Sequence, residues 1–143
     1  MKLRKIAVLF MTVVMVVGVL TSCANTPKVT VKISFIDQKG SAVIDTYTAE
    51  LKKENPTVAD AVNALSDAYA TAEDYANITW NEDGSAVKDV DAFKENLTPD
   101  ENKMIKYWTF LVNGKEVKGD ANDIVVQNDD VIVYEFVEEA IEE

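Results

Sequence analysis

Aromatic side chains that carry a hydrogen-bonding group are the residues of this sequence best suited to hold a ligand. A phenol or an indole presents an apolar face and one polar edge, which suits a flat organic molecule or a sugar. Neighbouring hydroxyl and amide groups would add hydrogen bonds at the rim. The candidate ligand-binding residues are Tyr107, Trp108, Thr109, Asn113, Trp80 and Tyr134.

The most closely spaced of these candidates also have a purely structural interpretation. Trp108 and Phe110 alternate with Tyr107 and Thr109, so the two pairs point to opposite faces of a strand. Large alternating apolar residues usually belong to the core. Asn113 precedes a glycine, and Asn-Gly readily forms a tight hairpin turn. We therefore expect Trp108 in the core, and the face that bears Tyr107 and Thr109 is the better place for a ligand.

The chain lacks most of the residues that catalysis would need. It has no histidine, which is the commonest general base and metal ligand. No serine stands in a Gly-x-Ser-x-Gly motif, and the single cysteine, Cys23, directly follows a predicted export signal. We therefore predict a protein that is not an enzyme and that needs no cofactor.

Two polar turns carry oxygen atoms that could bind a metal ion. They are Asn81–Gly84 and Asn128–Asp130. Neither has the spacing of an EF-hand calcium loop. Because turns rich in Asn and Asp have the same composition without any ion, we predict turns and no metal site.

The first 22 residues have the composition of an export signal. Three basic residues come first, and the apolar run that follows, Ile6 to Leu20, is shorter than the roughly 20 residues that span a bilayer. A resemblance to the bacterial lipobox is carried by Leu20-Thr21-Ser22-Cys23, and it implies cleavage before Cys23 and a diacylglyceryl lipid on its sulfur. The alternative is an uncleaved anchor with an incidental cysteine. We expect a bacterial lipoprotein held on the extracytoplasmic face of the cell membrane by this lipid.

Removal of the signal leaves a strongly acidic chain. The signal holds three of the 14 basic residues and none of the 25 acidic ones, so 11 lysines remain against 25 acids, a net charge of −14. Such a surface repels phosphate backbones. We exclude nucleic acid as a partner and interpret the acidity as a source of solubility.

The remaining chain divides into a tether, one domain and a tail. Residues 23–28 are a short tether, residues 29–137 form the domain, and residues 138–143 are an acidic tail that we expect to fray. A charged loop with one short helix is expected over residues 89–103. The predicted strands are Val29–Ile36, Ser41–Leu51, Ile78–Trp80, Ala86–Lys88, Met104–Val112, Lys115–Val117, Ile124–Val126 and Val131–Val137.

One amphipathic helix is predicted after the first two strands. Thr57 is a good N-cap, and Asp60 three residues later completes a pair like a capping box. Apolar residues then recur at helical spacing on one face, which would pack on a sheet. They are Val58, Ala61, Val62, Leu65, Ala68 and Tyr69.

The predicted elements are two strands, then a helix, then further strands, of which the last is central. This is the element order of a single α+β, β-grasp-like domain with a mixed sheet. The segments that carry a family resemblance follow the same order. They are Val29–Ile33, Thr57–Leu65, Trp108-x-Phe110-x-Val112-Asn113-Gly114 and Asn128–Ile132. Together they resemble the transcobalamin C-terminal-like domain, a β-grasp module of bacterial surface lipoproteins. The family commonly has glycine where this chain has Asp129, a residue that tolerates positive φ better than most.

The resemblance implies a function in ligand binding. In animal vitamin B12 carriers this domain is the smaller half of a clamp around cobalamin, so it implies at most half of a corrinoid site. We expect a non-enzymatic binding module for a corrinoid or a similar flat nutrient. The alternative is an interaction or structural module of the cell surface that binds another protein through an exposed sheet face or edge.

Overall fold

The computed structural model describes residues 26–70, 78–90 and 104–140. The predicted signal, the lipidation site Cys23 and the start of the tether lie outside these residues. So do residues 91–103 of the loop and short helix expected over 89–103, and the last three residues of the tail. The first two residues of that predicted loop, 89 and 90, instead belong to a strand, because they pair with the segment at 78–79. No helix in the described part combines the length and the apolar character that crossing a membrane would require.

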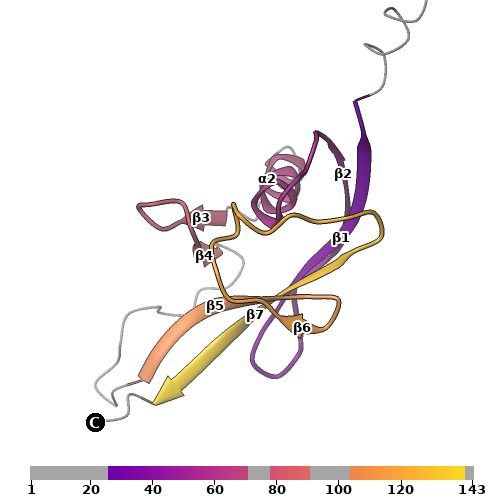
Figure 1. Ribbon diagram of the computed structural model, residues 1–143. Coiled ribbons are helices and arrows are strands. Elements are labelled where there is room, and N and C mark those ends of the chain that lie inside the picture. The colour runs from indigo at the N-terminus through magenta and orange to yellow at the C-terminus, as the bar shows by residue number, and fades with distance from the viewer. Residues whose placement is uncertain (1–25, 71–77, 91–103, 141–143) are drawn as a thin grey trace, which may run out of the picture.

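The described residues form a mixed α+β structure with one helix and a mixed sheet (Figure 1). The predicted strands and helix are present, except that the segment expected at 124–126 makes only a single bridge, between Thr57 and Val125. In chain order the elements are β1 (Lys28–Ile36), β2 (Ala42–Lys52), α2 (Val58–Tyr69), β3 (Ile78–Trp80), β4 (Val87–Val90), β5 (Met104–Val112), β6 (Lys115–Glu116) and β7 (Val131–Ala140).

Five strands form one sheet in the order β2-β1-β7-β5-β6, and β3 and β4 form a separate hairpin. Strand β7 runs parallel to β1 and antiparallel to β5, so it has a partner on each side and occupies the centre. The last strand is thus the central one, as in the predicted element order. Strand β5 lies one place farther out, and on its outer side it pairs with β6 only through Leu111 and Val112.

The end of β7 corrects the predicted acidic tail. The strand continues to Ala140, and Glu138 and Glu139 are paired with Lys106 and Ile105 of β5. Lys106 also forms an ion pair with Glu138 at 3.7 Å. Acidic composition suggested fraying at residue 138, but β5 begins early enough to give β7 a partner along its whole length.

The start of helix α2 is built as predicted. The Thr57 hydroxyl accepts from the Asp60 N–H at 3.3 Å, and the Asp60 carboxylate accepts from the Thr57 N–H at 2.8 Å. These two bonds satisfy backbone donors that a helix otherwise leaves open. Partial burial acts against the charge of Asp60, but the bonds from Thr57 and Lys53 prevail and hold its pKa below the ordinary value. The buried face of α2 consists of Val58, Ala59, Ala61, Val62 and Leu65.

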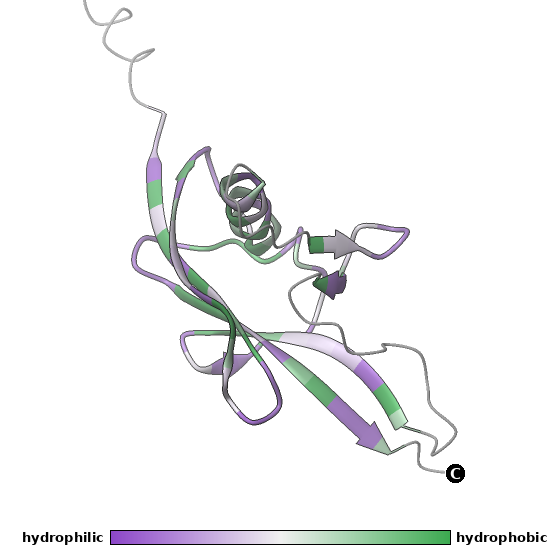
Figure 2. Cartoon of the chain, turned by 180° about the vertical axis from the view of Figure 1, so that it is seen from behind, coloured by the Kyte–Doolittle hydropathy of each residue, from purple (hydrophilic) through white to green (hydrophobic). Residues whose placement is uncertain are grey.

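The buried core contains a cluster of aromatic rings. Trp108 is 6% exposed, which confirms its predicted place in the core. Phe35 of β1 lies between Trp108 and Tyr134, with ring centres 5.4 and 4.7 Å away. Hydrophobic and hydrophilic residues alternate along β1 (Figure 2), and along β7 buried residues alternate with more exposed ones, which is the pattern of strands with one buried face.

Candidate ligand-binding site

The hairpin turn after β5 explains Asn113 without a ligand. Asn113 and Gly114 have φ angles of 52° and 76°, the left-handed pair that a type I′ turn requires. The Asn113 side chain donates to Asp130 at 2.7 Å and accepts from the Val131 N–H at 2.9 Å. The amide is therefore used to fasten this turn to the start of β7.

A second set of contacts holds the β3–β4 hairpin close to β5. The Asn122 side-chain amide donates to the Gly84 carbonyl at 2.8 Å. The Ala121 N–H donates to the Ser85 carbonyl at 3.2 Å. Within the hairpin loop, the Asn81 side chain accepts from the Ser85 N–H at 2.9 Å. The loop between β3 and β4 and the segment that follows β6 are thus tied together.

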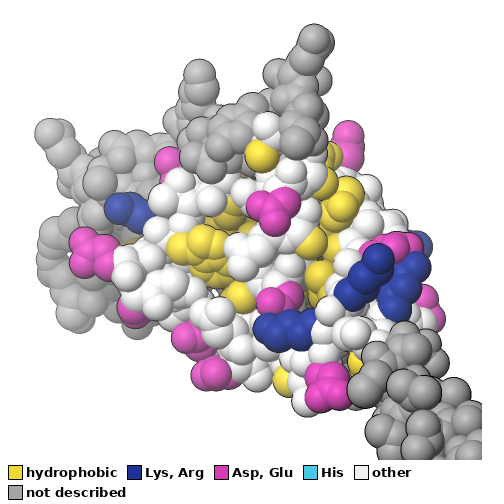
Figure 3. All heavy atoms as spheres, turned by 90° about the horizontal axis from the view of Figure 1, so that it is seen from above, with side chains coloured by type: hydrophobic (Ala, Val, Ile, Leu, Met, Phe, Trp, Pro, Cys, Tyr) yellow, Lys and Arg dark blue, Asp and Glu magenta, His cyan; other side chains and the backbone are white. Residues whose placement is uncertain are grey.

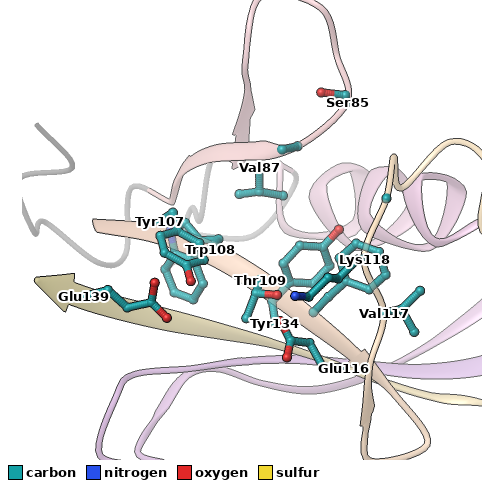
Figure 4. A pocket seen from close by; sticks show the side chains of 13 residues that line it. Ser85, Val87, Tyr107, Trp108, Thr109, Glu116, Val117, Lys118, Tyr134 and Glu139 are labelled. Carbon is teal, nitrogen blue, oxygen red and sulfur yellow. The ribbon is translucent and has the colours of Figure 1, made fainter. Parts of the chain in front are cut away.

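These segments surround a hollow of about 470 Å³ along the outer edge of β5 (Figure 4). Its volume lies within the range of small-molecule sites. Residues from both faces of β5 contribute, because the hollow wraps around the edge of this strand. The lining residues are Ser85, Ala86, Val87, Tyr107, Trp108, Thr109, Phe110, Glu116, Val117, Lys118, Gly119, Tyr134 and Glu139.

Tyr134 brings a buried hydroxyl group to this hollow. The residue is 1% exposed, and the hydroxyl has no hydrogen-bond partner among the described residues. Burial, and to a smaller extent the negative charge of Asp120, raises the pKa of the hydroxyl well above its ordinary range. The group therefore keeps its proton and can donate it to an acceptor. A buried polar group left without a partner costs about 1–3 kcal/mol, which a ligand oxygen would offset.

The rim of the hollow is polar. Tyr107 is 36% exposed, and partial burial, a hydrogen bond with Glu139 and the negative charges of Glu139 and Glu116 raise the pKa of its hydroxyl. Lys118 lines the hollow from the segment after β6 (Figure 4). None of Glu116, Lys118 and Glu139 forms an ion pair with another described residue. The rim can therefore both donate and accept hydrogen bonds.

The structure brings together four of the six residues predicted to bind a ligand: Tyr107, Trp108, Thr109 and Tyr134 all line the hollow. Asn113 lies in the hairpin turn, and Trp80 lies elsewhere on β3. The Trp80 indole N–H donates to Asn63 of α2 at 3.2 Å. This contact fastens the β3–β4 hairpin to the helix.

Sequence reasoning missed three charged residues of the hollow, Glu116, Lys118 and Glu139. In the sequence they read as ordinary solvated charges beside a turn and in an acidic tail. They reach the hollow only because β6 folds back along β5 and because β7 extends past Glu138. The Asn113-Gly114 turn followed by a predicted strand indicates the first event, but no local pattern indicates the second.

Hydrogen bonds within the protein engage side-chain oxygen atoms in both polar turns. Asp83 accepts from the Ser85 N–H at 2.9 Å, and Asn128 accepts from the Thr30 N–H at 3.0 Å. Asp129, at the position where the resembled family has glycine, has a φ angle of 68°, so this position does require the left-handed region. Among the described residues, no group of three or more His, Cys, Asp or Glu side chains is placed to hold a metal ion.

Comparison with known proteins gives likeness of fold alone. No protein-family model matches the chain, and no curated protein matches it. Haptocorrin, solved in complex with Cbi, is similar with a TM-score of 0.52 at 12% identity, over 82% of this chain and 26% of the haptocorrin chain. A "putative metal binding protein" from Ruminococcus gnavus ATCC 29149 is similar with a TM-score of 0.46 at 16% identity, over 78% of this chain and 98% of that chain. The chain thus shares the fold of about a quarter of haptocorrin.

Proposed function

We propose that this chain is a non-enzymatic binding module, held outside the bacterial cell membrane by a lipid on Cys23, and that the hollow beside β5 receives part of a small ligand. The observation that carries the ligand site is the Tyr134 hydroxyl, which is buried against the hollow and has no partner among the described residues. Proteins seldom leave a buried hydroxyl unsatisfied. A ligand acceptor at this position would satisfy it.

The lining of the hollow suits a neutral group that both donates and accepts hydrogen bonds. Tyr134 and Lys118 offer donors, while Glu116 and Glu139 offer acceptors. The chain as a whole carries a net charge of −11, which disfavours an anionic ligand. A primary amide meets these requirements, since its carbonyl oxygen accepts and its nitrogen donates.

A corrinoid is the first ligand to test. Its macrocycle carries several amide side chains, and the whole molecule is larger than the hollow, so only its edge would enter. The family resemblance in the sequence and the fold shared with part of haptocorrin support this choice. They also support a β-grasp-like domain over residues 29–137, because a hairpin, a helix and a strand parallel to β1 occur in that order.

Tryptophan fluorescence tests this proposal directly. Trp108 lines the hollow and Trp80 does not, so the soluble chain that begins after Cys23 is prepared with Trp80→Phe and titrated with cobalamin. We expect cobalamin to quench the fluorescence of Trp108, and the quenching to saturate as the cobalamin concentration rises. An unchanged emission spectrum at millimolar cobalamin excludes a corrinoid as the ligand. A set of amide-bearing nutrients would then be screened in the same way.

A second candidate function is binding to another surface protein. Strand β2 is an outer strand of the five-stranded sheet, so its outer edge has no partner strand among the described residues and offers backbone groups to an added strand. On the outer face of β5, Ile105 is 41% exposed. Substitution of Thr48 in β2 by proline would weaken such an interaction and would leave the cobalamin titration unchanged.

A further inference from the structure

A second hollow, of about 420 Å³, lies at the end of the sheet where β1 begins. Pro27, Val29, Pro56, Val125 and Val126 supply its apolar lining. In Figure 1 this end of β1 lies far from the end of β7, where Glu139 borders the first hollow. The two hollows therefore belong to different ends of the molecule.

Val125 is an exposed apolar side chain on a firmly held backbone. It is 51% exposed. On one side of it the Ile124 carbonyl accepts from the Val58 N–H at 2.9 Å, and on the other the Val126 N–H donates to the Pro56 carbonyl at 2.8 Å. These bonds fix the segment against the start of α2, so the exposure of Val125 is built into the fold.

The distance from this second hollow to the predicted lipid is short. Four residue steps separate Cys23 from Pro27, and each step spans at most about 3.6 Å. Pro27 therefore lies within about 14 Å of the lipidated cysteine, whatever path the chain takes. Because Pro27 and Val125 line the same hollow, the exposed valine is held near the bilayer as well.

Lysines and acidic residues both lie at this end of the molecule. Lys28 and Lys52 are paired across β1 and β2, and Lys53 and Glu54 border the hollow itself. Lys28 pairs with Glu50 at 2.6 Å and Lys53 with Asp60 at 3.0 Å. Such exposed pairs are weak, so the amines can exchange these partners for lipid phosphates. Figure 3, which looks onto this end, shows lysine and acidic side chains set among hydrophobic ones.

We infer that this end is a membrane-contact surface, in which Val125 and the apolar hollow sit in the headgroup layer of the phospholipid bilayer and the lysines meet lipid phosphates. An apolar side chain beside lysines is the composition of an interfacial contact. This orientation holds the ligand hollow beside β5 away from the membrane, where a solute can enter it. The inference rests on the lipid anchor of the proposed function.

The test places a fluorescent probe at each end of the lipidated full chain. Cys23 is the only cysteine and its sulfur would carry the lipid, so Val125→Cys introduces a single reactive thiol. Ile105→Cys is the matched control, because Ile105 is 41% exposed and lies at the opposite end, on β5. Each labelled protein is reconstituted into vesicles of phosphatidylcholine and phosphatidylglycerol that contain a headgroup-attached quencher.

We expect loss of fluorescence at position 125 and unchanged fluorescence at position 105. Unchanged fluorescence at both positions, with the protein bound to vesicles, overturns the inference but does not contradict the lipid anchor. Protein that stays in the aqueous phase instead overturns the anchor, and with it the proposed location. Quenching at both positions shows that the domain lies flat on the bilayer, which also overturns the inference.

Discussion

Replacement of Tyr134 by phenylalanine should make the free protein more stable and its ligand binding weaker. The hydroxyl oxygen is the only heavy atom removed, and the ring keeps its stacking on Phe35 at 4.7 Å. An unsatisfied buried hydroxyl costs about 1–3 kcal/mol, and part of that gain is lost because the missing oxygen leaves a small void. We expect the free energy of unfolding to rise by about 1 kcal/mol, which corresponds to roughly 4 °C in Tm.

The affinity for the ligand should change in the opposite direction to the stability. A hydrogen bond between Tyr134 and a ligand acceptor contributes about 1 kcal/mol, so its loss should weaken binding by about five- to tenfold. Urea unfolding measures the first effect, and the Trp108 titration measures the second. Tyr107→Phe is the matched control, because the Tyr107 hydroxyl lies at the exposed rim beside Glu139 and its removal should leave stability nearly unchanged.

Two results would refute this reasoning. If Tyr134→Phe lowers the free energy of unfolding by 1 kcal/mol or more, the hydroxyl has a partner in the folded protein and is not waiting for a ligand. If stability rises but ligand affinity is unchanged, the hollow is not where the ligand binds. A rise in stability together with weaker binding is the signature of a group held for function at a cost in stability.

Three further predictions concern the anchor, the helix start and the hairpin turn. Cys23→Ala should release the protein from the membrane fraction, and retention there would contradict the lipid anchor. The folded pKa of Asp60 is lowered from about 3.8, so its contribution to stability is present above that value and is lost as pH falls through the lower folded pKa. Asp60→Asn should flatten this acid dependence in unfolding curves measured from pH 5 to pH 2, and an unchanged slope would show that other carboxylates cause it. Gly114→Ala should destabilise the fold by about 1–2 kcal/mol, because alanine resists a φ angle of 76°; an unchanged urea midpoint would mean that the turn relaxes.

Local patterns were sufficient wherever neighbours in sequence decide the structure. Thr57 and Asp60 lie three residues apart, so their capping bonds close within one helical turn. The Asn113-Gly114 turn depends on two residues alone. The alternation of Trp108 with Tyr107 and Thr109 also sorted these side chains correctly between the core and the more exposed face.

Local patterns do not predict contacts between residues that are distant in sequence. The placement of β7 between β1 and β5 depends on pairing across about a hundred residues, such as Ile33 with Ile132. The same long-range pairing drew Glu138 and Glu139 out of the supposed tail and into the sheet.

The sequence by itself determined the acidic charge, the lack of histidine, the single cysteine behind an apolar leader and the elements of one small α+β domain. Composition and short-range spacing are enough for these features. Only the tertiary structure decided that Tyr134 is buried beside a hollow with no partner among the described residues, and that Glu116 and Lys118 border the same space. A binding site is a meeting of side chains from separate strands, and the order in which strands pair is set by the packing of the whole core.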